Sequence, residues 1–166
     1  HATIRRQRQM CIRDRQSTEA QTWFDRGILW TYGYNHEEAV MCFERAIGAD
    51  PKCAMAYWGA GYASGPNYNM PWDLFDYAGR AAAARAGYAN ARKALDMIDG
   101  VTRWEAALIN ALPARYPQPE PLDPEVMKAW NADFTDAMRE VFAAHPESHE
   151  VRTVFAESLL LSLIHI

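Results

Sequence analysis

The sequence predicts an all-α fold in which antiparallel helix pairs stack on one another. Two observations support this prediction. Aromatic and small residues recur at spacings of three and four over residues 19–34, which places them on one face of a helix. An alanine, an aromatic residue four positions later and a second alanine three positions after that occur from Ala39 to Ala46 and again from Ala84 to Ala91. Recurrence of one helix pattern along a chain is typical of repeat proteins.

The first helix pair is predicted over residues 16–52. Ser17 or Thr18 is a suitable N-cap for a helix over residues 19–34, because their hydroxyls can accept from free backbone N–H groups. The second helix is expected over residues 36–48, where a glycine and a following proline are stop signals.

Seven residues of this pair have the spacing of a tetratricopeptide (TPR) repeat, a helix-turn-helix unit of about 34 residues. They are Trp23, Gly27, Trp30, Ala39, Phe43, Ala46 and Pro51. Small residues at positions 27 and 39 allow the two helices to approach closely. We expect Trp23, Trp30 and Phe43 to fill the space beside that contact. Arg26 departs from the pattern, since leucine usually precedes this glycine.

Over most of residues 18–160, the chain resembles a largely uncharacterised group of bacterial and fungal TPR proteins. The resemblance is most specific in residues 23–69, through the runs 24–39, 53–59 and 65–69. It implies a right-handed α-solenoid that binds a protein or peptide, and no catalytic residues accompany it.

The second unit, residues 53–98, is longer than the first. A helix is expected over residues 54–64, followed by a run of turn-forming residues that cannot be helical throughout. Asp73 is expected to cap a long alanine-rich helix that ends near Met97. Insertions in repeats often carry binding, so the Gly65–Asn69 loop either binds a ligand or packs, with its asparagines satisfying backbone groups.

The third unit, residues 100–160, is predicted to contain three helices. A capping box at Thr102 and Glu105 begins the first helix, and an extended proline-rich connector is expected over residues 113–121. Asp123 and the proline after it begin the second helix. The last helix is expected after residue 148. The apolar stripe of the second helix consists of Val126, Trp130, Phe134, Met138 and Val141.

Both ends of the sequence resemble translated sequencing-adapter DNA. Leu161–Ile166 is what CTG TCT CTT ATA CAC ATC encodes, which resembles a transposase mosaic end, and Met10–Asp14 matches its reverse complement. We therefore expect residues 1–15 and 161–166 to be non-native. The piece between them, residues 16–160, is expected to be an internal, metagenomic fragment of a longer protein. A signal peptide upstream would be invisible, which leaves cytoplasmic, periplasmic and secreted locations open.

The charge balance argues against nucleic-acid binding. The whole chain has 17 basic and 21 acidic residues, a net charge of −4. Five arginines and one aspartate lie in residues 1–15, so the remainder carries −8. Nucleic-acid binding needs a basic patch, and the basic cluster of this chain lies in that predicted non-native head. The apolar C-terminal tail is too short for a membrane span.

The sequence contains no pattern that predicts catalysis or metal binding. His36 and the two residues after it begin like a zinc-protease helix, but Val40 occupies the position of the second histidine. Cys42 and Cys53 are expected to be small buried hydrophobes. We therefore expect no cofactor, no metal site and no intrinsic enzyme activity.

The inner helices of the predicted superhelix and its loop supply the candidate ligand- or peptide-binding residues. These are Phe24, Ile28, Thr31, Trp58, Tyr62, Asn67 and Asn69. An aromatic and uncharged inner face suits an apolar or extended peptide, whereas the alternative is that the aromatic side chains pack against the next repeat. The predicted function is a protein- or peptide-binding scaffold. The alternative is a regulatory or substrate-positioning region of a larger multidomain enzyme.

Overall fold

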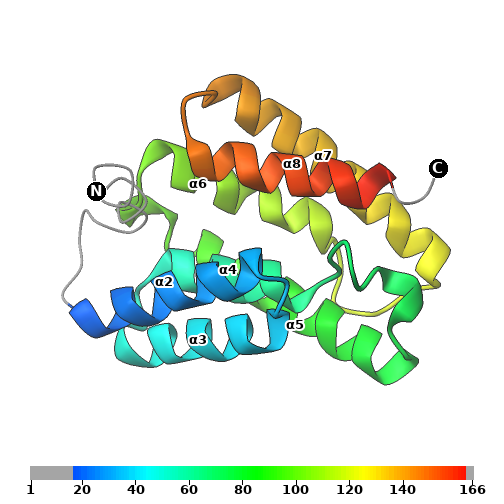
Figure 1. Ribbon diagram of the computed structural model, residues 1–166, viewed down its shortest axis with the longest axis horizontal. Helices are drawn as coiled ribbons and strands as arrows, with labels where there is room; N and C mark the ends of the chain where they lie inside the picture. The colour runs from blue at the N-terminus through cyan, green and yellow to red at the C-terminus, as the bar shows by residue number, and fades with distance from the viewer. Residues whose placement is uncertain (1–16, 164–166) are drawn as a thin grey trace.

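The structure is a computed structural model, which describes residues 17–163 (Figure 1). Within this range there are seven α-helices and no β-strand, which confirms the predicted all-α class. The α-helices are α2 (Thr18–Tyr32), α3 (His36–Ala49), α4 (Ala54–Ser64), α5 (Tyr77–Leu95), α6 (Arg103–Ala111), α7 (Pro124–Ala144) and α8 (His149–Leu163). The short 3-10 helices are η1 (Trp72–Leu74), η2 (Ile98–Gly100) and η3 (Leu112–Arg115).

Helices α2 and α3 form an antiparallel hairpin, and α4 packs against one side of it. Ser17 caps α2, as its hydroxyl accepts a hydrogen bond from the N–H of Ala20 (3.2 Å). The ring of Phe43 lies against both Gly27 of α2 and Gly59 of α4. A Cβ added to either glycine would lie 2.6 or 2.5 Å from that ring, which is closer than atoms can pack. The missing side chains therefore let three helices share one aromatic ring.

The turn between α2 and α3 contains a strained tyrosine. Tyr34 has φ of 57°, whereas Gly33 has an ordinary negative φ of −83°. A bulky residue seldom occupies the left-handed region, since its Cβ crowds the backbone. Asn35 then begins α3, because its side chain accepts a hydrogen bond from the N–H of Glu38 (3.3 Å).

The start of α5 differs from the prediction. Asp73 lies in the 3-10 turn η1 instead of capping the long helix, and its carboxylate is 2.9 Å from Nζ of Lys128 on α7. Asp76 caps α5 and accepts from the N–H of Gly79 (2.6 Å). The prediction missed this because the ion pair to α7 is a tertiary contact that local capping patterns do not contain.

Helices α6, α7 and α8 form a layer beside that of α2 to α5 (Figure 1). The predicted capping box at Thr102 and Glu105 is confirmed, and so is the N-cap at Asp123. Two expectations were wrong. The connector predicted to be extended over residues 113–121 is 3-10 helical as far as residue 115, and Val126 is 50% exposed while its neighbour Met127 is buried. Helix α8 continues past residue 160, with Leu161 only 1% exposed.

Side chains of η3 and α4 join the two layers. The Tyr116 hydroxyl donates to the carbonyl oxygen of Gly61 (2.8 Å), and the Trp58 indole N–H donates to that of Leu108 (3.1 Å). Arg115, which is 1% exposed, donates to the carbonyl oxygen of Pro66. The layers are thus connected by hydrogen bonds inside an apolar core.

The close contact between Tyr116 and α5 predicts opposite effects of two glycine substitutions. In Gly87→Ala, the new Cβ would lie 2.3 Å from the Tyr116 ring, which is fully buried and tethered by its hydroxyl. We expect Gly87→Ala to lower the free energy of unfolding by about 1–2 kcal/mol, because the cost of overpacking exceeds the gain in helix propensity. Gly48→Ala meets nothing within 4 Å, and should stabilise the protein by up to about 1 kcal/mol. Urea denaturation followed by circular dichroism measures both; stabilisation by both substitutions would show that Tyr116 is not held in place.

Candidate binding groove

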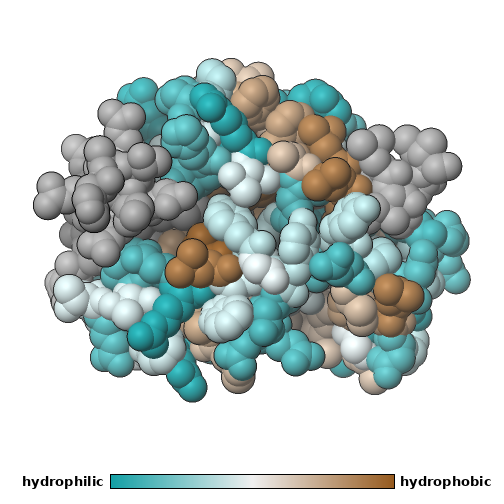
Figure 2. All heavy atoms as spheres, in the orientation of Figure 1, coloured by the Kyte–Doolittle hydropathy of each residue, from teal (hydrophilic) through white to brown (hydrophobic). Residues whose placement is uncertain are grey.

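Most residues predicted to bind a peptide on the inner face belong to the core. Phe24, Thr31, Trp58, Tyr62 and Asn67 are between 0% and 5% exposed. Ile28 is half-buried and Asn69 is exposed. On the face seen in Figure 2, hydrophobic side chains gather only in small separate groups between hydrophilic ones. The predicted inner-face residues therefore do not line an open groove together.

The inner aromatic residues of α4 pack against the second layer. Trp58 and Tyr62 stack with their ring centroids 5.1 Å apart, and Tyr62 is tilted against Phe134 of α7 at 6.2 Å. The guanidinium of Arg115 lies 4.8 Å from the Tyr62 ring centroid and 5.1 Å from that of Phe134. This arrangement favours the interpretation that these side chains pack rather than hold a ligand.

The Gly65–Asn69 loop closes on itself through one asparagine. The side-chain oxygen of Asn67 accepts from the N–H groups of Asn69 (2.9 Å) and Met70 (3.1 Å). Asparagine side chains commonly stabilise turns in this way. The geometry favours the packing alternative for the loop.

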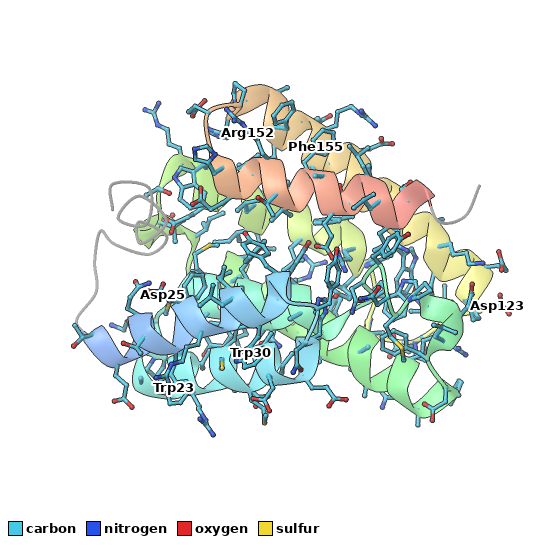
Figure 3. The ribbon with its side chains drawn as sticks, viewed as in Figure 1. Trp23, Asp25, Trp30, Asp123, Arg152 and Phe155 are labelled. Carbon is cyan, nitrogen blue, oxygen red and sulfur yellow. The ribbon has the colours of Figure 1, made fainter. Side chains whose placement is uncertain are left out.

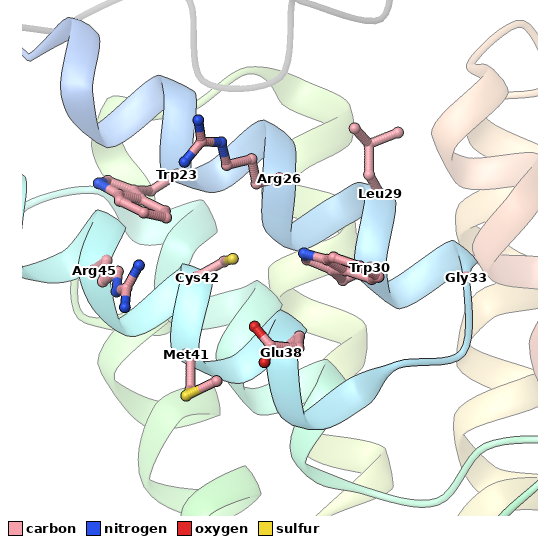
Figure 4. Close-up of a pocket in the computed structure, with 9 residues that line it drawn as sticks. All are labelled: Trp23, Arg26, Leu29, Trp30, Gly33, Glu38, Met41, Cys42 and Arg45. Atoms are coloured by element: carbon pink, nitrogen blue, oxygen red, sulfur yellow. The ribbon is translucent and has the colours of Figure 1, made fainter.

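An open groove lies between α2 and α3, on the side of the hairpin that α4 does not cover (Figure 4). Its volume is about 580 Å³. The lining residues are Trp23, Arg26, Leu29, Trp30, Gly33, Glu38, Met41, Cys42 and Arg45. Figure 3 shows Trp23 and Trp30 on the α3 side of α2, away from the layer of α6 to α8.

The groove arises because α2 has two separate stripes. Residues 20, 24, 27 and 31 form the buried stripe, while residues 23, 26 and 30 lie on the adjacent flank at the same spacing. The sequence prediction placed Trp23 and Trp30 on the same face as Gly27 and expected both to fill the space beside the helix contact. Instead Trp30 is 45% exposed and Trp23 is half-buried. Of the remaining motif residues, Gly27, Ala39, Phe43 and Ala46 are buried and Pro51 is exposed.

The charges of the groove are separated along its length. The guanidinium groups of Arg26 and Arg45 lie 4.7 and 4.5 Å from the ring centroid of Trp23, at one end. Glu38 lies toward the other end, beside Trp30 (Figure 4). Within residues 17–163, no carboxylate lies within 4 Å of either guanidinium. Neither arginine was identified from the sequence, although Arg26 departs from the TPR pattern and that departure was the available signal.

The thiol at the floor of the groove is not poised for nucleophilic chemistry. Burial and the nearby Glu38 raise the pKa of Cys42, and the two arginines only partly oppose this shift. A thiol with a raised pKa stays protonated and behaves as a small hydrophobe. In the described part of the chain, no group of three or more histidine, cysteine, aspartate or glutamate residues could hold a metal ion. None of the helices in this part is both long and apolar enough to span a membrane.

Two groups near the turn between α2 and α3 have shifted pKa values of opposite sense. Burial and the nearby Arg115 lower the pKa of His36 to about 4, and its Nδ1 lies 3.1 Å from the carbonyl oxygen of Ala63. Burial raises the pKa of Glu157 to about 7, and its Oε1 has no hydrogen-bond partner. Burial is the main cause that raises the pKa of Tyr32 and Tyr34; the Glu157 carboxylate adds to the shift of Tyr34, and Glu150 followed by Glu157 adds to that of Tyr32.

The shift at Glu157 predicts a pH-dependent stability. Its pKa is about 7 in the folded protein against an ordinary 4.5, so the folded state holds a proton that the unfolded chain has released between those values. The contribution of Glu157 to the unfolding free energy should therefore fall as pH rises through this window, and comparison with a Glu157 variant isolates it from the opposite contribution of His36. Glu157→Gln should raise the free energy of unfolding by about 1–3 kcal/mol at pH 8 and should alter it little at pH 4.5. Urea denaturation at both pH values measures this, and Glu140→Gln on the exposed side of α7 is the matched control. Equal effects of Glu157→Gln at the two pH values would contradict the assignment.

Comparison of the chain with protein-family models, with curated proteins and with solved structures finds no match.

Proposed function

We propose that this chain is a protein-binding helical module that holds its partner in the groove between α2 and α3. The observation that carries the proposal is the exposure of large apolar side chains in one groove. Leu29 is 70% exposed, Trp30 45% and Met41 44%. Contiguous exposed apolar side chains mark interaction sites, and Trp, Met and Arg are enriched at protein interfaces.

The proposal includes a TPR-type architecture for the helix pairs and their stacking as a solenoid fragment. It is supported by the α2–α3 hairpin, in which Phe43 lies against Gly27 while Ala39 and Ala46 are buried. A helix pair of this kind serves as one unit of a scaffold with extended binding surfaces. In this proposal the groove between α2 and α3 replaces the inner face as the binding surface, because the inner aromatic residues pack in the core.

The proposed role is binding without intrinsic catalysis. The groove is apolar and aromatic in its middle and charged only toward its ends, which suits the recognition of a partner. Its one thiol, that of Cys42, has a raised pKa and is therefore a weak nucleophile.

Selection of binders from a random peptide library tests this proposal. Peptides enriched on the wild-type chain should lose at least tenfold in affinity for the double variant Trp30→Ala/Met41→Ala, since large apolar anchors dominate interface energies. Fluorescence anisotropy measures the Kd values. The matched control is Leu74→Ala/Tyr77→Ala, which removes apolar side chains that are 61% and 72% exposed outside the groove. If the enriched peptides bind the Trp30→Ala/Met41→Ala variant as tightly as the wild type, the groove is not the binding surface.

A further inference from the structure

The groove has an apolar floor, and its charged side chains are distributed asymmetrically along its length. Arg26 and Arg45 both stack on the indole of Trp23, so two positive charges occupy one end. Glu38 places a negative charge on the other side of Cys42 from Arg45, beside Trp30 (Figure 4). Any extended partner in this groove therefore meets opposite charges at its two ends.

The dimensions of the groove fit a helix. The lining residues of α2 and its C-cap extend from Trp23 to Gly33, a separation of ten residues that corresponds to about 15 Å or three helical turns. Between the charged ends lie Trp30, Met41 and Cys42, which form an apolar seam between two helices. An amphipathic helix places residues i, i+3, i+4 and i+7 on one face and docks by this face into such a seam.

A docked helix carries its own charge polarity. The free N–H groups at its N-terminal end form a positive pole and the free carbonyl groups at its C-terminal end a negative pole. Arginine guanidinium groups hydrogen-bond both carbonyl and carboxylate oxygens, and stacking on Trp23 fixes the two guanidinium planes before the partner arrives. The arginine end therefore favours a helix C-terminus and the Glu38 end a helix N-terminus.

We infer that the partner is an amphipathic helix that lies antiparallel to α2 and carries carboxylate side chains in its last turn, against Arg26 and Arg45. This inference rests on the proposed function and specifies the chemistry of the partner that the groove would bind. Because α2 and α3 are antiparallel, a helix in this orientation lies parallel to α3. Residues 1–16 of the chain do not have this chemistry, because they contain five arginines and one aspartate.

Two synthetic 14-residue peptides of identical composition test the inference. Both carry leucines at positions i, i+3, i+4 and i+7 and are held helical by the same lactam bridge on the solvent face. One has two glutamates in its last turn, and the other has them in its first turn. We expect the first peptide to bind the wild-type chain at least tenfold more tightly than the second, as measured by fluorescence anisotropy.

Charge reversal supplies the second arm. The variant Arg26→Glu/Arg45→Glu should lose most of the preference for the first peptide, because its groove end is now negative. The matched control is Arg85→Glu/Arg103→Glu, which reverses two exposed arginines outside the groove and should keep the preference. Circular dichroism verifies that both variants are folded.

The outcomes separate this inference from the proposed function. Equal binding of the two peptides that is lost in Trp30→Ala/Met41→Ala would overturn the directional inference and leave the groove as a binding surface. If neither peptide binds, both the directional inference and the proposed function of the groove are overturned. A preference that persists in Arg26→Glu/Arg45→Glu, or self-association of the chain that competes with the peptides, would also overturn the inference.

Discussion

The insertion of Tyr116 and Arg115 between the two helical layers is the contact on which the rest of the structure depends. Tyr116 fits against α5 because Gly87 has no side chain there, and its hydroxyl is bonded inside the core. Arg115 brings a charge into that core without a carboxylate partner among residues 17–163, and burial lowers its pKa. The rings of Tyr62 and Phe134 on either side offset part of the desolvation cost through cation–π contacts.

This insertion determines which surfaces of the molecule are open. Because η3 holds α7 against α4, the aromatic side chains of the inner face become core residues. Helix α4 covers only one side of the hairpin of α2 and α3. The apolar groove lies on the other side. The proposed binding surface is thus the side of the hairpin that faces away from the junction of the two layers.

Features governed by local chemistry were predicted well from the sequence. The helix Ala54–Ser64, the capping box at Thr102 and the N-cap at Asp123 all depend on residues within a few positions of each other. Features that depend on contacts between layers were missed. Arg115 and Tyr116 lie in a proline-rich stretch without periodicity, and nothing local indicates that their side chains enter the core. The groove was missed because two adjacent stripes of one helix, which include Phe24 and Trp30 respectively, have the same spacing and differ only in which neighbour covers them.

The opposed environments of His36 and Glu157 have a consequence for how the chain exchanges protons with solvent. Near pH 5.5 the unfolded chain has a protonated imidazole and an ionised carboxylate, whereas the folded chain has a neutral His36 and a protonated Glu157. Folding then releases one proton and takes up another. From these two groups the net proton exchange is close to zero, so together they contribute little to the pH dependence of folding in this range, even though the pKa of each is far from its ordinary value. The fold in effect transfers a proton from an imidazole to a carboxylate.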